Sequence, residues 1–257
     1  MLFGSKNGTS FYRFENLAGW GGIDHRIFTR RNGFSPRPFA SLNVSLGIGD
    51  AETNVARNRD LIRRSMAGGD FVYARQVHGC RIAVLKGPGP EHGAETAAGA
   101  ITADALVTDL PGKYLVIQVA DCQAVLLYDP VRRVIANVHC GWRGSLLNVI
   151  GRALEAMTHH FNCRPERIRA GIGPSLGPCC AEFINYKAEI PANFWAYKDA
   201  SDHFDFWAIS HDQLMRAGVA DKNIEVSRIC TRCRTDEFYS YRAAKTTGRF
   251  AAVIGIK

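Results

Sequence analysis

Residues Ala105 to Gly144 read ALVTDLPGKYLVIQVADCQAVLLYDPVRRVIANVHCGWRG. This stretch contains four short apolar runs that are rich in β-branched residues, a composition typical of strands. The runs are Ala105–Thr108, Tyr114–Val119, Ala124–Tyr128 and Val134–Val138. Turn residues separate two pairs of them, at Pro111-Gly112 and at Asp129-Pro130. The stretch therefore predicts the buried strands of a β-sheet.

Three segments outside this stretch have the pattern of helices. Asp50–Met66 combines spaced apolar residues with arginines, and Ser145–Phe161 has a continuous apolar side. Ser145 is a suitable N-cap because it follows Gly144 and precedes the apolar residues. A shorter helix is expected at Asp212–Ala217.

The remaining segments are predicted to be strands and loops. Strand composition marks Phe71–Leu85, a segment that ends at Gly171–Pro174, and a final strand at Phe250–Ile256. Gly19–Ser41 and Lys86–Gly99 are rich in turn residues and are predicted to be irregular loops. Since no repeat or linker is visible, residues 1–257 are predicted to form one α+β domain.

The composition excludes several classes of protein. Apolar residues make up 46% of the 257, so the chain can build a core, and the net charge of +8 favours anionic ligands. No long Lys/Arg run supports nucleic-acid binding, and no secretory signal or membrane-spanning apolar run is present. We therefore expect a cytoplasmic protein, in which eight reduced cysteines would serve for metal binding, catalysis or burial.

Three residues stand out as candidate metal ligands. His78 and His139 each lie at the end of a predicted strand, close to a glycine, and Cys122 ends a third strand. Two imidazoles and one thiolate would leave the fourth position of a tetrahedral zinc ion open, as in catalytic zinc sites. The separations of 44 and 17 residues match no compact zinc motif. Spacing alone therefore leaves open another interpretation, in which the two histidines are only hydrogen-bonded and the cysteine is a buried free thiol.

Seven motifs in a fixed order carry a family resemblance. They are Ser41-Leu42-Asn43, Gln76–Gly79, Ala103–Thr108, Ala120–Cys122, His139–Gly144, Gly173–Cys180 and Thr247–Arg249. Together they resemble the laccase-like polyphenol oxidase family, whose members are also described as purine nucleoside phosphorylases and include the laccase domain-containing proteins. The resemblance implies a sheet sandwich flanked by helices in αββα layers. It also implies that His78, Cys122 and His139 bind zinc, with copper as a possible alternative, and act in catalysis.

The resemblance further implies a purine nucleoside enzyme with small-molecule partners, a nucleoside and phosphate. The expected reactions are phosphorolysis of adenosine, inosine or methylthioadenosine, and deamination of adenosine. Three alternatives remain: a hydrolase of peptidoglycan precursors that uses Cys122 as nucleophile and His139 as base, a copper-dependent phenol oxidase, and a metal-binding protein without activity.

Candidate substrate-binding residues are Asn43, Arg59, Gln76 and Arg143. The two arginines are candidates because a guanidinium offers phosphate a planar fork of donors. Asp121 is a candidate general acid or base, and Cys80 a spare soft ligand.

A second group of cysteines consists of Cys230-Thr231-Arg232-Cys233 and the pair Cys179-Cys180. The group could form a structural zinc site. We favour buried or free thiols, because adjacent cysteines rarely both reach one ion.

Overall fold

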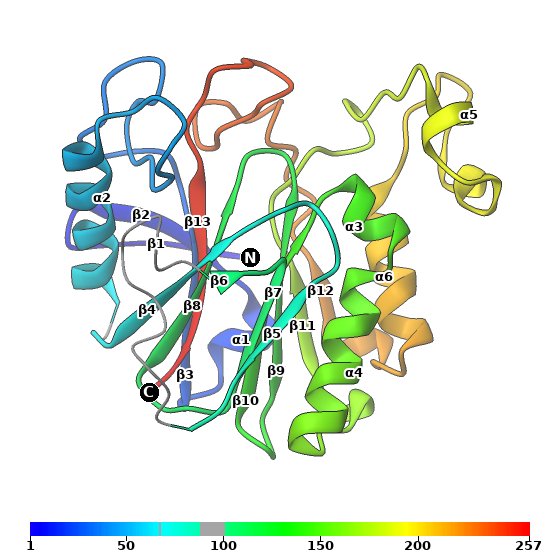
Figure 1. The fold of residues 1–257 in the computed structure, drawn as a ribbon, viewed down its shortest axis with the longest axis horizontal. Helices are drawn as coiled ribbons and strands as arrows, with labels where there is room; N and C mark the ends of the chain where they lie inside the picture. Colours follow the sequence, from blue (N-terminus) through cyan, green and yellow to red (C-terminus); the bar gives the residue numbers. More distant parts are fainter. Residues whose placement is uncertain (67, 88–100) are drawn as a thin grey trace.

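Two mixed β-sheets pack face to face in the computed structural model, which describes residues 1–66, 68–87 and 101–257 (Figure 1). The first sheet has seven strands in the order β1-β2-β3-β13-β8-β4-β6. These strands are β1 (Leu2–Lys6), β2 (Thr9–Arg13), β3 (Ile23–Phe28), β4 (Asp70–Arg75), β6 (Ile101–Thr102), β8 (Lys113–Val119) and β13 (Phe250–Ile256).

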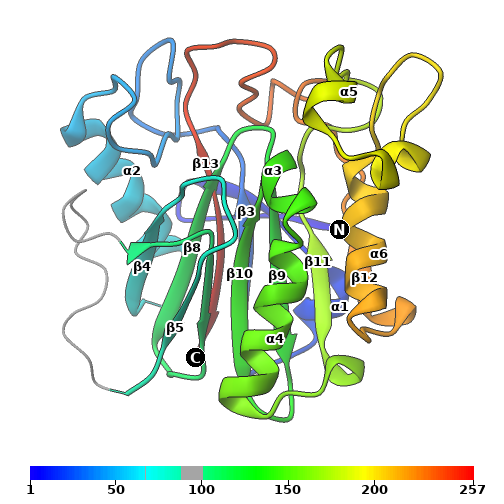
Figure 2. The same cartoon turned by 45° about the vertical axis from the view of Figure 1, so that its right-hand side comes forward.

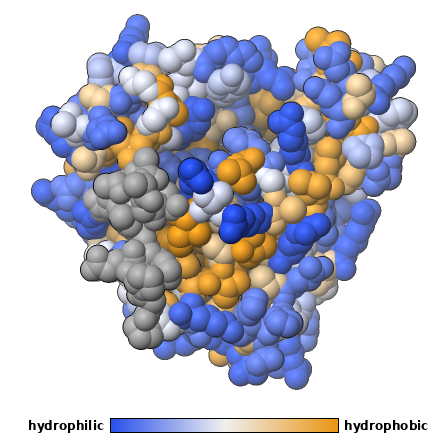
Figure 3. Space-filling model, in the orientation of Figure 1, coloured by the Kyte–Doolittle hydropathy of each residue, from blue (hydrophilic) through white to orange (hydrophobic). Residues whose placement is uncertain are grey.

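The second sheet has six strands in the order β12-β11-β9-β10-β7-β5. These are β5 (Ile82–Leu85), β7 (Ala105–Thr108), β9 (Gln123–Asp129), β10 (Val134–Cys140), β11 (Arg169–Ile172) and β12 (Ile224–Val226). Pairing is antiparallel at its centre and parallel at both edges, where β5 pairs with β7 and β11 with β12. Figure 3 shows apolar surface at the centre of the face that carries β5, whose first three residues are only half-buried.

Helices cover the outer faces of both sheets (Figure 2). The α-helices are α1 (Glu15–Ala18), α2 (Glu52–Ser65), α3 (Trp142–Leu146), α4 (Val149–Phe161), α5 (Tyr186–Glu189) and α6 (Phe206–Arg216). Short 3₁₀ turns add η2 (Pro165–Arg167), η3 (Ala192–Tyr197) and η4 (Asp221–Asn223). Within the described ranges, no helix is long and apolar enough to cross a bilayer.

Three apolar clusters define the layers. One lies between the sheets and includes Ile117, Leu126 and Ile254. A second joins the seven-stranded sheet to Ile62 of α2, and a third joins the six-stranded sheet to residues of α4 such as Leu154. This order of layers confirms the predicted αββα sandwich.

Most of the predicted central elements match the structure. Ala105–Thr108 and Phe250–Ile256 have the predicted bounds, and α2 lies inside the predicted helix Asp50–Met66. Most of the predicted loop Lys86–Gly99 lies outside the described residues. The helix predicted at Asp212–Ala217 is the second half of α6, which begins at Phe206.

The prediction of a loop at Gly19–Ser41 was wrong, because β3 lies within it and pairs with β13. The strand has polar residues in buried positions: His25 is 2% and Arg26 6% exposed. His25 accepts a hydrogen bond from the Phe14 amide at 2.9 Å, and Arg26 donates to Ser65. These internal partners allow the burial of side chains that a sequence pattern assigns to solvent.

The helix predicted at Ser145–Phe161 was also wrong at its start. Two helices occupy this region, and Asn148 separates them in a left-handed conformation, with φ of 53°. Its side chain accepts from the Gly151 amide and therefore caps α4. Ser145 lies inside α3, where its hydroxyl donates to the Gly141 carbonyl.

The single strand predicted at Phe71–Leu85 is two strands, β4 and β5, which belong to different sheets. Residues 76–81 carry the chain from one sheet to the other, as Figure 1 shows. Another change of sheet occurs between β8 and β9, at Ala120–Cys122. Both connections carry a predicted metal ligand.

We predict that His25→Gln reduces the loss of stability in mild acid. Burial lowers the pKa of His25 from 6.5 to about 3, so below pH 6.5 the unfolded chain binds a proton that the folded chain does not. This histidine should therefore lower the free energy of unfolding by about 2 kcal/mol as the pH falls from 7 to 5. Urea unfolding of both proteins at several pH values measures the difference. The prediction is wrong if the free energy of unfolding falls equally with decreasing pH in both proteins.

Candidate metal centre

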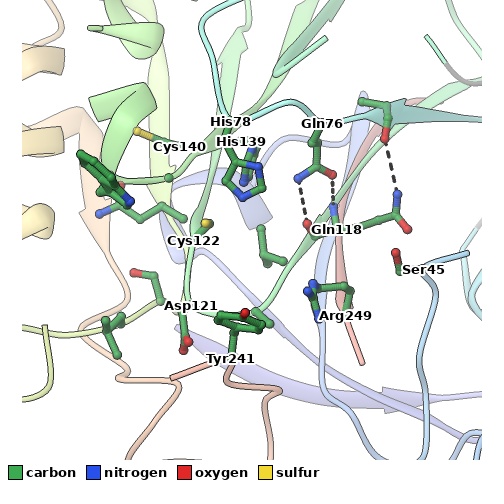
Figure 4. Close-up of a pocket in the computed structure, with 18 of the residues that line it drawn as sticks. Ser45, Gln76, His78, Gln118, Asp121, Cys122, His139, Cys140, Tyr241 and Arg249 are labelled. Atoms are coloured by element: carbon green, nitrogen blue, oxygen red, sulfur yellow. Dashed lines mark hydrogen bonds between the residues drawn. The ribbon is translucent and has the colours of Figure 1, made fainter. Parts of the chain in front are cut away.

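The three predicted ligands meet at one end of the sandwich, where the chain changes sheets. His78 lies on the connection between β4 and β5, Cys122 on the turn between β8 and β9, and His139 is the penultimate residue of β10. The three donor atoms all lie within 4.8 Å of one another, and the imidazole rings are edge to face (Figure 4). Residues that are far apart in the sequence thus form one group.

The backbone leaves room for an ion beside these donors. His78 has a left-handed conformation with φ of 57°, which is uncommon for a residue with a side chain. A Cβ atom at Gly141 would lie 3.0 Å from the Cys122 sulfur and 3.3 Å from the His78 ring. Glycine at this position therefore keeps the space between the ligands open. His139 is buried, whereas His78 is exposed, so the group is accessible from one side.

The carboxylate of Asp104 orients two of the three candidate ligands. It is fully buried and accepts hydrogen bonds from the backbone amides of Val77, His78 and Gly79. Its Oδ1 also lies 2.9 Å from Nδ1 of His139. This contact holds the proton on Nδ1 and leaves Nε2 with a lone pair for a metal, as is usual for metal-binding histidines.

Electrostatics at the site suits a thiolate ligand. Burial alone would raise the pKa of the Cys122 thiol, but His139 and His78 outweigh it and lower the pKa from 9.0 to about 6. Burial would lower the pKa of His139, but Cys122 and Asp104 raise it to about 9. A thiolate with two imidazoles is a donor set that fits zinc, with one coordination position free.

A cavity of about 820 Å³ opens beside the three ligands. Its wall has a strong excess of positive charge. The cationic residues are Arg59, Arg75, Arg143, Arg242, Lys245 and Arg249. Among the described residues of this wall, Asp121 supplies the one carboxylate. Such a cavity favours an anionic ligand.

Aromatic side chains supply the apolar part of the same wall. They are Tyr73, Trp142, Phe183, Phe206 and Tyr241. Trp142 and Phe183 meet edge to face with their centroids 5.9 Å apart. Flat apolar surfaces beside charged groups can accommodate a ring system that carries an anionic or polar end.

Three of the four predicted substrate-binding residues line this cavity. Arg59 is 5% exposed, donates from Nε to the Val44 carbonyl and lies over the Tyr73 ring. Gln76 exchanges two hydrogen bonds with the backbone of Gln118, which fixes its amide (Figure 4). Arg143 is exposed and stacks on Trp142.

Asn43 lies behind the wall and is not one of its lining residues. Its side chain is fully buried, donates to Asp50 and accepts from the backbone amides of Ser45 and Arg249. These contacts position Ser45 and Arg249, both of which line the cavity.

Asp121 and Cys80 occupy different environments. Asp121 lines the cavity, and its two oxygens accept hydrogen bonds from the Thr231 hydroxyl at 2.7 Å and the Arg242 amide at 2.6 Å. It therefore anchors a loop besides facing the cavity. Cys80 packs against the apolar cluster below α4 and is not part of the three-ligand group.

Sequence reasoning missed the contribution of residues 241–249. Tyr241, Arg242, Lys245 and Arg249 all line the cavity, yet they precede β13 in a segment without helical or strand periodicity. Figure 4 shows Tyr241 and Arg249 on the side of the cavity opposite His78. The family motif Thr247–Arg249 could have indicated from the sequence that Arg249 belongs to the site.

Comparisons with known proteins agree with this geometry. Residues 24–257 match the family described as multi-copper polyphenol oxidoreductase laccase. The chain belongs to this family. It is 34% identical to a purine nucleoside phosphorylase of Deinococcus radiodurans over 97% of this chain and 94% of that protein. It is 32% identical to purine nucleoside phosphorylase YlmD of Geobacillus stearothermophilus, over 89% of this chain and 88% of that protein.

Solved structures of family members have the same fold. The crystal structure of the hypothetical protein YfiH of Bacillus licheniformis superposes with a TM-score of 0.90 at 29% identity, covering 99% of each chain. That of YlmD from Geobacillus stearothermophilus gives 0.86 at 29% identity, covering 99% of this chain and 98% of that one. The whole sandwich is therefore common to these proteins.

We predict that Asp104→Asn weakens zinc binding at this site about 10- to 100-fold while the chain stays folded. The amide keeps the size of the carboxylate but lacks its charge and cannot accept from every donor around it. Zinc affinity measured by competition with a chelator tests this, with circular dichroism as the check on folding. Asp109→Asn, at an exposed position, is the matched control. Equal affinities in both variants would remove Asp104 from the metal centre.

Proposed function

We propose that this chain is a zinc-dependent purine nucleoside phosphorylase, with His78, Cys122 and His139 as the metal ligands. One observation carries the proposal: the three donors open into a cavity whose wall combines six cationic side chains with aromatic surfaces. The names of the relatives from Deinococcus radiodurans and Geobacillus stearothermophilus support the same activity.

Phosphorolysis joins an anion to a neutral nucleoside. An oxygen of hydrogen phosphate forms a bond to C1′ of the ribose, the bond from C1′ to the purine nitrogen breaks, and the proton that the phosphate gives up ends on the leaving base. The enzyme must hold the phosphate beside C1′ and stabilise the charge that develops on the base. The cations and aromatic rings of this cavity suit these two tasks.

Arg59 is the arginine that we assign to phosphate. Its stacking on Tyr73 and its bond to Val44 fix the guanidinium, so little side-chain entropy is lost when an anion binds. Gln76 and Arg143, which both line the wall, are assigned to the nucleoside. Asn43 is assigned a supporting role through Ser45 and Arg249.

The metal would extend the chemistry of the site. When bound, zinc polarises a substrate oxygen and lowers the pKa of water. On this basis we include adenosine deamination as a second activity, and adenosine, inosine and methylthioadenosine as nucleosides for phosphorolysis. Asp104 serves both activities by holding His139 in one tautomer.

A thiol hydrolase is the second candidate, because Cys122, His139 and Asp104 also have the order of a nucleophile, a base and an orienting carboxylate. The two functions make opposite demands on the thiolate, since a sulfur bound to zinc is a poor nucleophile. A hydrolase should need no phosphate and should work without metal.

Copper-dependent phenol oxidation has less support. Several clustered copper ions require many histidines, and the described residues contain one histidine-bearing group of metal donors, with two imidazoles. A single group of this kind does not provide the several copper sites that a multicopper phenol oxidase would need.

We predict that the purified protein cleaves adenosine or a related purine nucleoside only when phosphate is present, yielding free base and ribose 1-phosphate. Product analysis with and without phosphate measures this. Cys122→Ala should abolish turnover, because it removes one of three metal ligands. Cleavage of peptidoglycan precursors by metal-free protein, with no nucleoside cleaved, would make the enzyme class wrong.

We predict that Arg59→Lys raises the KM for phosphate about tenfold or more and changes the KM for nucleoside much less. Lysine keeps the charge but lacks the planar fork that stacks on Tyr73. Steady-state kinetics with each substrate varied in turn tests this. Arg57→Lys is the control on the same helix, at an exposed position. An unchanged phosphate KM would exclude Arg59 from the phosphate site.

A further inference from the structure

Four cysteines outside the cavity form a second cluster of soft donors. Cys179 and Cys180 lie in a turn that follows β11, and Cys230 and Cys233 lie in a turn that follows β12. Their four sulfur atoms all lie within 4.8 Å of one another. The sequence separates the two pairs by about fifty residues, so the fold alone brings them together.

The distances between the sulfur atoms distinguish a metal site from a disulfide. Cys233 lies 3.7 Å from Cys179 and 3.6 Å from Cys180, sulfur to sulfur. A disulfide requires about 2.05 Å. Zinc binds each thiolate at about 2.3 Å, which places the corners of a tetrahedron roughly 3.8 Å apart. The two spacings to Cys233 are close to this value, and the remaining ones are below 4.8 Å.

Backbone hydrogen bonds hold both turns in this arrangement. Ser175 and Cys230 form a parallel bridge, and the Thr231 amide donates to the Ser175 carbonyl at 3.0 Å. Within the turns, the Cys180 amide donates to the Gly177 carbonyl, and the Arg234 amide donates to the Cys230 carbonyl. These bonds turn the two cysteine pairs toward each other and explain how adjacent cysteines share one centre.

Donors around the sulfur atoms suit thiolates. The Gly177 amide donates to the Cys230 sulfur at 3.3 Å, and Arg232 donates to the Cys180 sulfur at 3.5 Å. A Cβ atom at Gly177 would lie 2.7 Å from Trp207 and 3.1 Å from the Cys230 Cβ, so only glycine allows this approach. Donors to sulfur and a nearby guanidinium offset the negative charge of a four-thiolate zinc centre.

We propose that Cys179, Cys180, Cys230 and Cys233 bind a second zinc ion, which has a structural role. Four protein ligands close the coordination sphere and leave no position for water or substrate, as in structural zinc sites. The proposal replaces the free thiols that the sequence favoured. It does not depend on the proposed nucleoside chemistry.

The second ion would tie together two segments that line the cavity. Ser175 and Leu176 precede the first cysteine pair, and Tyr241 and Arg242 follow the second pair. Arg242 also donates to the Cys180 carbonyl at 3.1 Å. Loss of the ion should therefore loosen one wall of the cavity and lower the melting temperature.

Metal analysis of the full chain, purified without added metal, tests the proposal. The protein should contain two zinc ions per chain. Cys179→Ser combined with Cys233→Ser, both at exposed positions, should lose one ion, and Cys122→Ser should lose the other. Cys80→Ser, outside both clusters, should retain two. Because each variant addresses one site, failure at the second site leaves the proposed function standing.

Cobalt replacement tests the same site without any substitution. Cobalt bound by four thiolates gives intense sulfur-to-metal charge-transfer bands. These bands should keep most of their intensity in Cys122→Ser and should fall, in the double variant, to the weak absorption of the single Cys122 thiolate. Full zinc content in a folded double variant would overturn the proposal. So would a mass of the wild-type chain that is about two daltons low and that is restored by reduction, which would indicate a disulfide.

Discussion

The Asp104 carboxylate makes the interactions on which the candidate metal centre depends. It is fully buried, and a buried charge is tolerated only when hydrogen bonds replace its lost hydration. Three amides of the connection between the sheets and the ring of His139 supply those bonds. The same contacts stabilise the left-handed conformation of His78, which would otherwise be unfavourable. One charge therefore fixes the path of the connection and the orientation of two candidate ligands.

The sequence predicted the centre of this fold better than its edges. Continuous apolar runs such as Ala105–Thr108 and Phe250–Ile256 are buried on both faces, and their composition alone indicates strands. β3 lacks that signal, because His25 and Arg26 find partners only in the folded chain. The hairpin of β1 and β2 was missed although Asn7-Gly8, both with positive φ, is a recognised turn signal.

The residues of the candidate site also fall into a predictable and an unpredictable group. His78, Cys122 and His139 could be singled out because they adjoin apolar strands, and the family resemblance made them candidate metal ligands, whereas Tyr241 and Lys245 come from a segment with no periodic pattern. Asn43 shows the converse difficulty. In a sequence, an asparagine whose buried amide holds the backbone of Arg249 looks the same as an asparagine whose amide binds substrate. Only the three-dimensional contacts distinguish a residue that lines a cavity from one that supports its wall.

The two cysteine-containing groups meet at the turn between β8 and β9. Cys122 faces the histidines, and the preceding Asp121 accepts from Thr231, which lies between the cysteines of the second cluster. Asp121 has a φ of 79°, so this turn is strained and needs bonds on both sides to persist. The Arg242 amide supplies another bond, and its guanidinium reaches the Cys180 carbonyl. The segment that carries the four-cysteine cluster is therefore bonded to the same turn that positions Cys122, so a change in that cluster can affect the position of a candidate metal ligand outside it.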